Sequence, residues 1–195
     1  MRCLAPSLLL AITLTTSACG AAMNEPDIKQ NPSPRQRYEL IATVNAPEAF
    51  ELAHGHSHYQ VSNASCVPKA PLTGGRNMPN ISHDFELTRA NDGTYRGYFY
   101  LDQFQNDDYF GLGLCHMDLM SAGPNFSIHG LSFNTALMLD DILQQKSRMR
   151  FFSKNEFFNK TLGGAALERA ANDQDVMEHP DAYFSITVIA HEVTP

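Results

Sequence analysis

Apolar and polar residues alternate over several short stretches of this chain, and this alternation constrains the fold more than any other feature. Within AYFSITVIAH, every second residue from Phe184 to Ala190 is apolar. Side chains two positions apart lie on the same side of a β-strand, so this spacing predicts a strand with one buried face. YELIATVNA (38–46) and RMRFF (148–152) are predicted to be further strands.

A β-hairpin is predicted within ISHDFELTRANDGTYRGYFYLDQF, residues 81–104. Ile81, Phe85 and Leu87 share one face of the first arm, and polar residues occupy the positions between them. The stretch 91–93, Asn-Asp-Gly, supplies residues that tolerate the positive φ of a tight turn.

The middle of the chain continues the pattern with interruptions at glycine. YFGLGLCHMDLM (109–120) reads as a strand in which two glycines mark a bulge or a close backbone approach, and SAGPN (121–125) then ends it. In FSIHGLSFNTALML (126–139) the apolar positions change phase at Gly130, which predicts a bulge or bend. Only GGAALERAAN (163–172) is typical of a helix.

Many short strands and little helix predict an all-β fold, an antiparallel β-sandwich with at most one short helix. An immunoglobulin-like or transthyretin-like arrangement is expected, with a small closed barrel as the alternative. The chain has no tryptophan, so it lacks the Cys-Trp-Cys hallmark of antibody domains.

The first twenty residues, MRCLAPSLLLAITLTTSACG, have the layout of a secretory signal. Arg2 is followed by an apolar stretch too short to span a bilayer and then by small residues. Ala18 followed by Cys19 resembles the lipobox of bacterial lipoproteins, although Thr16 stands where that motif has Leu, Val or Ile. The alternative is a signal cleaved near SACGAA without lipid attachment.

The lipobox resemblance implies that Cys19 carries palmitate and becomes the mature N-terminus. In that family a residue other than Asp after the cysteine directs the protein to the outer membrane, and Gly20 fits this rule. The expected organisation is a signal peptide (1–18), a lipidated cysteine with a flexible, proline-containing tether (19–37), and one β-sandwich domain (38–195).

The charge balance excludes one class of partner. The chain has a formal net charge of −7, and removal of Arg2 with the signal leaves −8. Nucleic acid and anionic membrane surfaces would repel such a protein, so only the lipid would hold it to a membrane. Another periplasmic or secreted protein is the expected partner.

Two cysteines, Cys66 and Cys115, remain once Cys3 leaves with the signal and Cys19 takes the lipid. An even pair in an oxidising compartment predicts a disulfide, which would close a loop of about 50 residues. Two buried free thiols are the alternative.

HGHSH places histidines at positions 54, 56 and 58. On a strand, His54, His56 and His58 would share one face, and neighbouring imidazoles at that spacing can bind zinc or copper together with a third ligand. The alternative is a polar edge strand or loop, because the residues between them, such as Gly55 and Ser57, make a poor core face.

Signals for catalysis are weaker. Ser132 follows a glycine in HGLSFN, but a nucleophile elbow needs a second glycine where Asn134 stands, so it is expected to be an ordinary strand residue. The acidic loop LDQFQNDDY (101–109) lacks EF-hand spacing and is expected to be solvated. In NEFFNK, at least one of Phe157 and Phe158 is expected to be buried.

SCVP (65–68) and DDYFGLGLCHMDL (107–119) resemble segments of uncharacterised periplasmic lipoproteins of Gram-negative bacteria that carry a cysteine-bridged β-domain. Some immunity proteins have this build. An acidic β-domain on a flexible tether, without a catalytic constellation, predicts a non-enzymatic, lipid-anchored protein-binding module that faces the periplasm, of which an immunity or inhibitor lipoprotein is one version. The resemblance adds to the expected compartment and binding role. A metal-binding lipoprotein that uses the three histidines is the alternative function.

The lipobox interpretation makes a direct prediction about Cys19. Cys19→Ser should abolish lipidation and release the protein into the soluble fraction, because the acidic chain offers no other membrane affinity. Metabolic labelling with palmitate, followed by membrane fractionation, measures both effects. Label that persists on Cys19→Ser would contradict the interpretation.

Overall fold

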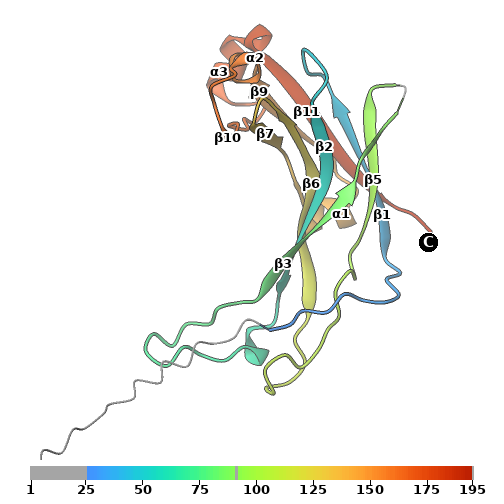
Figure 1. Ribbon diagram of the computed structural model, residues 1–195, viewed down its shortest axis with the longest axis vertical. Helices are drawn as coiled ribbons and strands as arrows, with labels where there is room; N and C mark the ends of the chain where they lie inside the picture. The colour runs from blue at the N-terminus through green and yellow to red at the C-terminus, as the bar shows by residue number, and fades with distance from the viewer. Residues whose placement is uncertain (1–25, 91, 195) are drawn as a thin grey trace, which may run out of the picture.

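The computed structural model describes residues 26–90 and 92–194, and this part of the chain forms two packed β-sheets (Figure 1). Sheet 1 has the strand order β4-β5-β1-β11-β9, and sheet 2 has the order β10-β7-β6-β2-β3, with β8 also paired to β6. All strand pairs described are antiparallel except the short β10–β7 pair, which is parallel. The predicted antiparallel β-sandwich is confirmed. The strands form two separate sheets, so the alternative of a closed barrel is wrong.

The element bounds are as follows. The strands are β1 (Arg37–Val44), β2 (Leu52–Val61), β3 (Asn80–Glu86), β4 (Thr88–Arg89), β5 (Thr94–Tyr100), β6 (Met117–Ile128), β7 (Leu131–Asn134), β8 (Leu137–Met138), β9 (Arg148–Ser153), β10 (Gly164–Ala165) and β11 (Tyr183–Glu192). The helices are α1 (Leu139–Leu143), α2 (Lys154–Phe158) and α3 (Gln174–Glu178), with 3₁₀ turns η1 (Ala64–Cys66) and η2 (Pro180–Ala182).

The core lies between the sheets and is rich in aromatic side chains. The ring centroid of Phe133 of sheet 2 lies 5.5 and 5.6 Å from those of Phe152 and Phe184 of sheet 1, and the ring centroid of Phe126 lies 4.8 Å from that of Tyr95 on β5. The four phenylalanine rings are almost fully buried. Burial of such side chains supplies the main driving force for closing the sandwich.

A buried hydrogen bond also joins the sheets. Tyr59 of β2 lies in the core, and its hydroxyl donates to the carbonyl oxygen of Tyr100 on β5. Burial raises the pKa of Tyr59 to about 12, so the hydroxyl remains protonated at neutral pH. The hydroxyl group is therefore satisfied inside the apolar core.

The predicted hairpin at 81–104 is only partly correct. The turn forms, with Gly93 at φ 82°, whereas Asn91 lies outside the described residues. The long first arm, β3, pairs with β2 in sheet 2, and only the two residues of β4 pair with β5. The chain changes sheets between them against Gly97, where a Cβ would lie 2.4 Å from the carbonyl oxygen of Glu86.

The strands near the glycines differ from the prediction in their limits and in their turns. Gly111 and Gly113 lie in a loop with φ of 70° and 107°, and β6 begins only at Met117. β6 then runs through the predicted break at 121–125. Gly130, with His129, forms a two-residue turn of positive φ between β6 and β7, so the change of phase marks a hairpin and not a bend.

The segment 163–172 is not the predicted helix. Gly164 and Ala165 pair with β7, and the backbone N–H and carbonyl of Arg169 bond to Phe151 of β9. An isolated helix of ten residues is only marginally stable. In the structure the backbone groups of this segment form hydrogen bonds with β7 and β9 instead. Three α-helices of five residues each replace the single helix expected.

The disulfide between Cys66 and Cys115 is confirmed, with Cα atoms 5.4 Å apart. It joins the loop that follows β2 to the loop that precedes β6, in the lower part of Figure 1. Both sulfurs lie in the buried core. A loop of about 50 residues closed in this way stabilises by up to about 4 kcal/mol in the chain-entropy model.

The signal peptide and Cys19 lie outside the described residues. Part of the predicted tether is held against the domain. The backbone N–H of Asn31 donates to the carbonyl of Gln103, and the backbone N–H groups of Arg35 and Gln36 donate to the carboxylate of Asp102. The folded domain therefore includes residues before the predicted boundary at residue 38.

Candidate binding face

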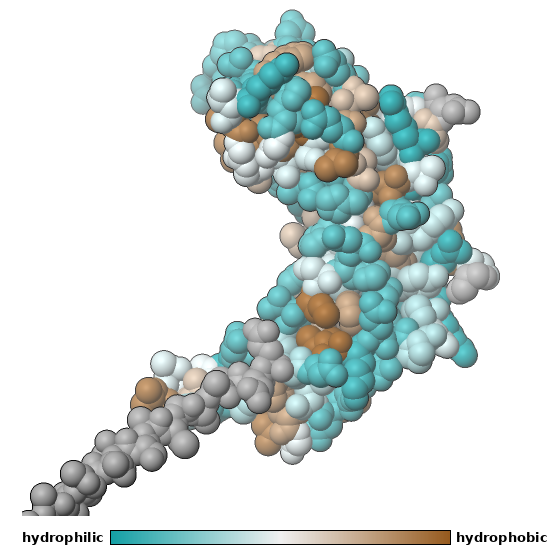
Figure 2. Space-filling model, viewed as in Figure 1, coloured by the Kyte–Doolittle hydropathy of each residue, from teal (hydrophilic) through white to brown (hydrophobic). Residues whose placement is uncertain are grey.

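The outer side of sheet 2 is hollowed in the view of Figure 2. In the middle of Figure 1, β2 and β6 of sheet 2 lie to the left of β1 and β5 of sheet 1. In Figure 2 the outline is hollowed beside the middle of β2 and β6, between the lobe that carries α2 and α3 and the lower loops. We call the outward side chains of β2, β3 and β6, with the β7–β8 connection, the concave face.

The three histidines lie on this face. β2 is an interior strand between β3 and β6, so the alternative of an edge strand or loop is wrong. His54, His56 and His58 point outward, while Gly55 and Ser57 are buried beneath them. Gly55 is suited to the core because the ring of Phe85 occupies the space of a Cβ, about 2.0 Å from its position. From the sequence, the inner face of β2 seemed unsuited to a core because Gly55 has no side chain. In the structure the ring of Phe85, on the neighbouring strand β3, fills that space.

Each histidine has a different polar neighbour. Nδ1 of His56 lies 2.7 Å from Oδ1 of Asp84, and this hydrogen bond lowers the pKa of the Asp84 carboxyl. Nδ2 of Asn125 donates to Nε2 of His54 over 3.2 Å. Nδ1 of His58 lies 3.3 Å from Oγ of Ser82. The imidazoles therefore bond to β3 and β6.

Across residues 26–90 and 92–194, no group of three or more His, Cys, Asp or Glu side chains is arranged to hold a metal ion. A zinc or copper ion at the histidines would have to displace their present neighbours. Metal binding by His54, His56 and His58 therefore stays a prediction.

A cavity of about 400 Å³ opens beside His56 on the concave face. β6 pairs with β8 at Ala122 and with β7 at Asn125, but Gly123 and Pro124 between them have no pairing on that side. Proline is tolerated in β6 because its missing N–H falls at this interruption. Thr135 and Ala136 cross over Gly123, where a Cβ would lie 2.0 Å from the carbonyl oxygen of Thr135.

The charged groups around this cavity already have partners. Arg148 lies 2.9 Å from the carboxylate of Asp141, and Glu168 lies 3.5 Å from Nε of Arg150. His56, also at the rim, bonds to Asp84. The side chains that remain available to bind a ligand in this cavity are therefore uncharged.

The neutral groups at the cavity are hydroxyls and amides. Asn134 is exposed and Ser121 is half-buried at the wall. Thr135 is only 2 % exposed, and its Oγ1 has no hydrogen-bond partner among the described residues. A buried hydroxyl without a partner costs about 1–3 kcal/mol relative to a satisfied one.

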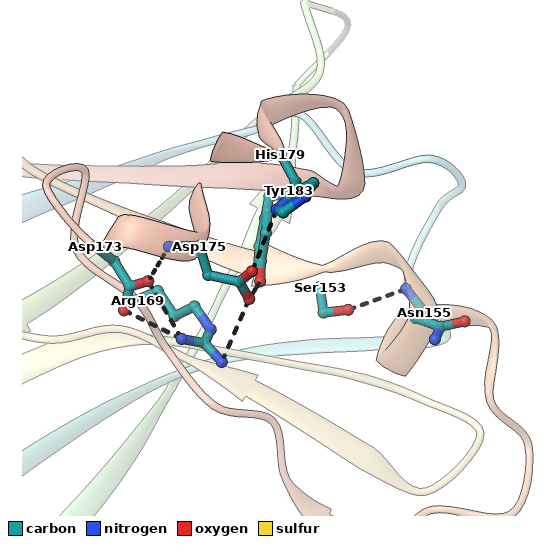
Figure 3. A network of polar contacts seen from close by, with 7 residues as sticks. All are labelled: Ser153, Asn155, Arg169, Asp173, Asp175, His179 and Tyr183. Carbon is teal, nitrogen blue, oxygen red and sulfur yellow. Dashed lines mark hydrogen bonds and ion pairs between the residues drawn. The ribbon is translucent and has the colours of Figure 1, made fainter. Parts of the chain in front are cut away.

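A second polar cluster lies around α3 (Figure 3). Arg169 lies 3.1 Å from the carboxylate of Asp173, which also caps α3 by accepting from the backbone N–H of Asp175. The hydroxyl of Tyr183 donates to Asp175, and Nδ1 of His179 lies 3.4 Å from the same carboxylate. Through these contacts, the segment after β10 packs against the start of β11.

The electrostatics of this cluster favour a structural role. The hydrogen bond from Tyr183 lowers the pKa of Asp175, and the same bond raises the pKa of Tyr183. Both shifts move the groups away from neutral pH, whereas a general acid or base works best with a pKa near the working pH.

The remaining sequence candidates are ordinary structural residues. Ser132 lies within β7, as expected. In the acidic loop, Asp102 accepts from backbone amides of residues 35 and 36, and Asp108 accepts from those of residues 112 and 113. Phe157 is buried and Phe158 is 52 % exposed, so the expectation of at least one buried ring is confirmed.

Sequence reasoning missed the cavity. Gly123 and Pro124 were placed between two predicted strands, and nothing near Thr135 or Arg148 indicated that these residues line one cavity. The Gly-Pro pair indicates that strand pairing is interrupted at this point. It does not indicate whether the strand ends there or continues, as β6 does.

No family model, curated protein or solved structure matches this chain. Within the residues that the structure describes, no helix has the length and apolar character needed to cross a membrane.

The unpartnered hydroxyl predicts an unusual stability change. Thr135→Val keeps the shape of the side chain and removes the unsatisfied group, so it should stabilise the fold by about 1 kcal/mol, or roughly 3 °C in Tm. Ser57→Ala is the matched control, because the buried Ser57 Oγ donates to the His83 carbonyl over 2.9 Å. It should destabilise by about 1 kcal/mol. Thermal unfolding of both variants measures the difference, and a destabilised Thr135→Val would contradict the prediction.

Proposed function

We propose that this chain is a non-enzymatic, lipid-anchored module that binds another protein in the periplasm through its concave face. The observation that carries the proposal is the hollow outer side of sheet 2, which presents side chains that the core does not use. Cys19 would supply the anchor at the outer membrane, and an immunity or inhibitor role is one version of the proposal.

The composition of the concave face supports protein binding. Histidine, serine and asparagine side chains dominate its centre. Exposed apolar side chains lie on β6 and at β8, where Met120 and Met138 are 41 % and 50 % exposed. A surface that combines apolar groups with neutral hydrogen-bonding groups is typical of protein interfaces, where charged residues are depleted at the centre.

The charge of the chain supports a basic partner. At neutral pH the formal net charge is −7, which would accelerate association with a positively charged protein and repel nucleic acid. Acidic residues near the concave face, such as Asp84, Glu86 and Asp118, are exposed at its rim. The rim would then steer the partner, and the neutral centre would supply most of the contact area.

Site-specific photo-crosslinking in the native cells tests this proposal. A benzophenone amino acid at Met120, on the concave face, should give a discrete crosslinked product, whereas the same residue at Thr43 should not. Thr43 is the matched control because it is exposed on the outer side of sheet 1. Equal products from both positions, or none from Met120, would contradict the proposed binding face.

The second proposal is metal binding at the histidines, which is favoured by the outward alignment of His54, His56 and His58 on β2. Their separate hydrogen bonds predict that zinc and copper bind only weakly, and that binding falls further near pH 5 as protons compete for the ring nitrogens. Titration calorimetry of the wild type and His56→Ala measures this. A submicromolar site that His56→Ala abolishes would establish the metal function in place of the first proposal.

A further inference from the structure

We propose that two loops of the domain, residues 67–79 and 107–114, lie on the phospholipid surface to which the chain is anchored, with Leu72 inserted among the lipid headgroups. We call these two segments the lower loops. The inference rests on the lipid anchor of the proposed function. It goes beyond that function by assigning a second, direct membrane contact, which would fix the orientation of the domain.

The first of the lower loops projects from the body of the domain. It connects η1 to β3 and extends away from sheet 2 at the lower left of Figure 1. Leu72 lies in its turn at 71–73 and is 99 % exposed, the highest value among the large apolar side chains that the structure describes as exposed. A single exposed leucine is ordinary, so the neighbouring loop decides whether this one belongs to a contact surface.

The second of the lower loops presents two more leucines. Leu112 and Leu114 are 54 % and 52 % exposed. The side chain of Asp108 holds this loop in shape, because its Oδ1 accepts from the backbone N–H groups of Leu112 and Gly113 over 3.0 and 3.1 Å. The exposure of the two leucines is therefore a property of a hydrogen-bonded loop.

The lower loops are joined to each other at their bases. Cys66 precedes the first and Cys115 follows the second, and the disulfide links them. Nδ2 of Asn63 donates to the carbonyl oxygen of Leu114 over 2.8 Å, and Oδ1 of Asn63 accepts from the backbone N–H of His116. In Figure 2 apolar surface is visible at this lower end of the molecule. One braced unit therefore presents the three leucines.

The lipid anchor would bring this unit to the membrane. Pro26, where the described chain begins, lines a cleft of about 510 Å³ together with Val67 and Met78, so the chain enters the domain beside the first of the lower loops. Seven residues lead from Cys19 to Pro26, and a fully extended chain of that length spans at most about 25 Å. Lipid on Cys19 would therefore hold this end of the domain close to the bilayer.

The local charge favours a lipid surface over a basic protein. The segments 26–30, 67–79 and 107–114 balance three basic residues against three acidic ones, although the whole chain has a net charge of −7. Loop 67–79 contains Lys69 and Arg76 and no acidic residue. Long basic side chains beside an inserted leucine can reach lipid phosphates. A basic partner would find no electrostatic attraction at this end.

The contact is too small to replace the anchor. Stable membrane attachment takes two signals, and a few leucines bury far less apolar surface than an amphipathic helix does. On an anchored chain, however, the lower loops are held at a high effective concentration near the lipid. The unlipidated Cys19→Ser chain would still be released, and the loops would orient only the anchored one.

Tryptophan fluorescence of the lipidated, full-length protein in vesicles tests the inference, because the chain has no tryptophan of its own. The vesicles contain phosphatidylethanolamine and phosphatidylglycerol in a 3:1 ratio, with or without brominated phosphatidylcholine, which quenches tryptophan among the lipids. Quenching of Leu72→Trp should exceed that of Met177→Trp at least threefold. Met177 is the matched control because it is 61 % exposed on α3, in the upper lobe of Figure 1.

A second reporter removes the bias that tryptophan itself favours membrane interfaces. Leu112→Trp should also be quenched, and adding Leu72→Ser with Lys69→Glu should reduce this quenching at least twofold. The matched pair Leu167→Ser with Lys160→Glu makes the same chemical changes at exposed positions between α2 and α3 and should leave the quenching unchanged. Circular dichroism of each variant verifies that the fold is intact.

The outcomes separate this inference from the proposed function. Equal quenching of Leu72→Trp and Met177→Trp in a lipidated chain would overturn the membrane contact and leave the anchor standing. A benzophenone amino acid at position 72 that crosslinks to a protein and not to lipid would overturn it in favour of a protein partner. Absence of palmitate from Cys19 would overturn the anchor and this inference together, while the crosslink from Met120 tests the binding face independently.

Discussion

The packing of phenylalanine rings between the two sheets is the interaction on which the rest of the structure depends. Phe126 and Phe133 lie on the inner side of sheet 2, where Phe133 contacts Phe152 and Phe184 of sheet 1 and Phe126 contacts Tyr95 of sheet 1. This contact fixes which side of each strand faces inward. It therefore also fixes which side chains of β2 and β6 are left on the outside, and these are the residues that form the concave face.

The concave face differs from an ordinary solvated sheet surface at one place, the interruption between β7 and β8. Two residues of β6 lose their pairing there, and the chain that should have paired with them crosses above Gly123. The consequence is a hollow at whose rim Arg148 pairs with Asp141 and Glu168 pairs with Arg150. Because the core and the disulfide hold the surrounding strands, this hollow is a feature of the fold and needs no ligand to form.

The alternation of apolar and polar residues predicted the strands correctly where one face of the strand is buried. The alternation from Phe184 to Ala190 gave β11, and the pair of Cys66 and Cys115 gave the disulfide. The errors lie where the choice of partner is not local. The arm at residues 81–86 pairs with β2 and not with its sequence neighbour β5, because Gly97 lets the chain cross between sheets. Residues 163–172 have helical composition, but pairing with β7 and β9 decided their conformation.

The sequence by itself determined the β class, the cysteine pair and the common face of His54, His56 and His58, because these depend on the two-residue period of a strand and on residue type. Tertiary structure alone decided that β2 is an interior strand, that Phe85 covers Gly55, and that Thr135 lies over Gly123. These features depend on contacts between residues far apart in the chain. Such contacts arise when the sheets pack, and no local spacing encodes them.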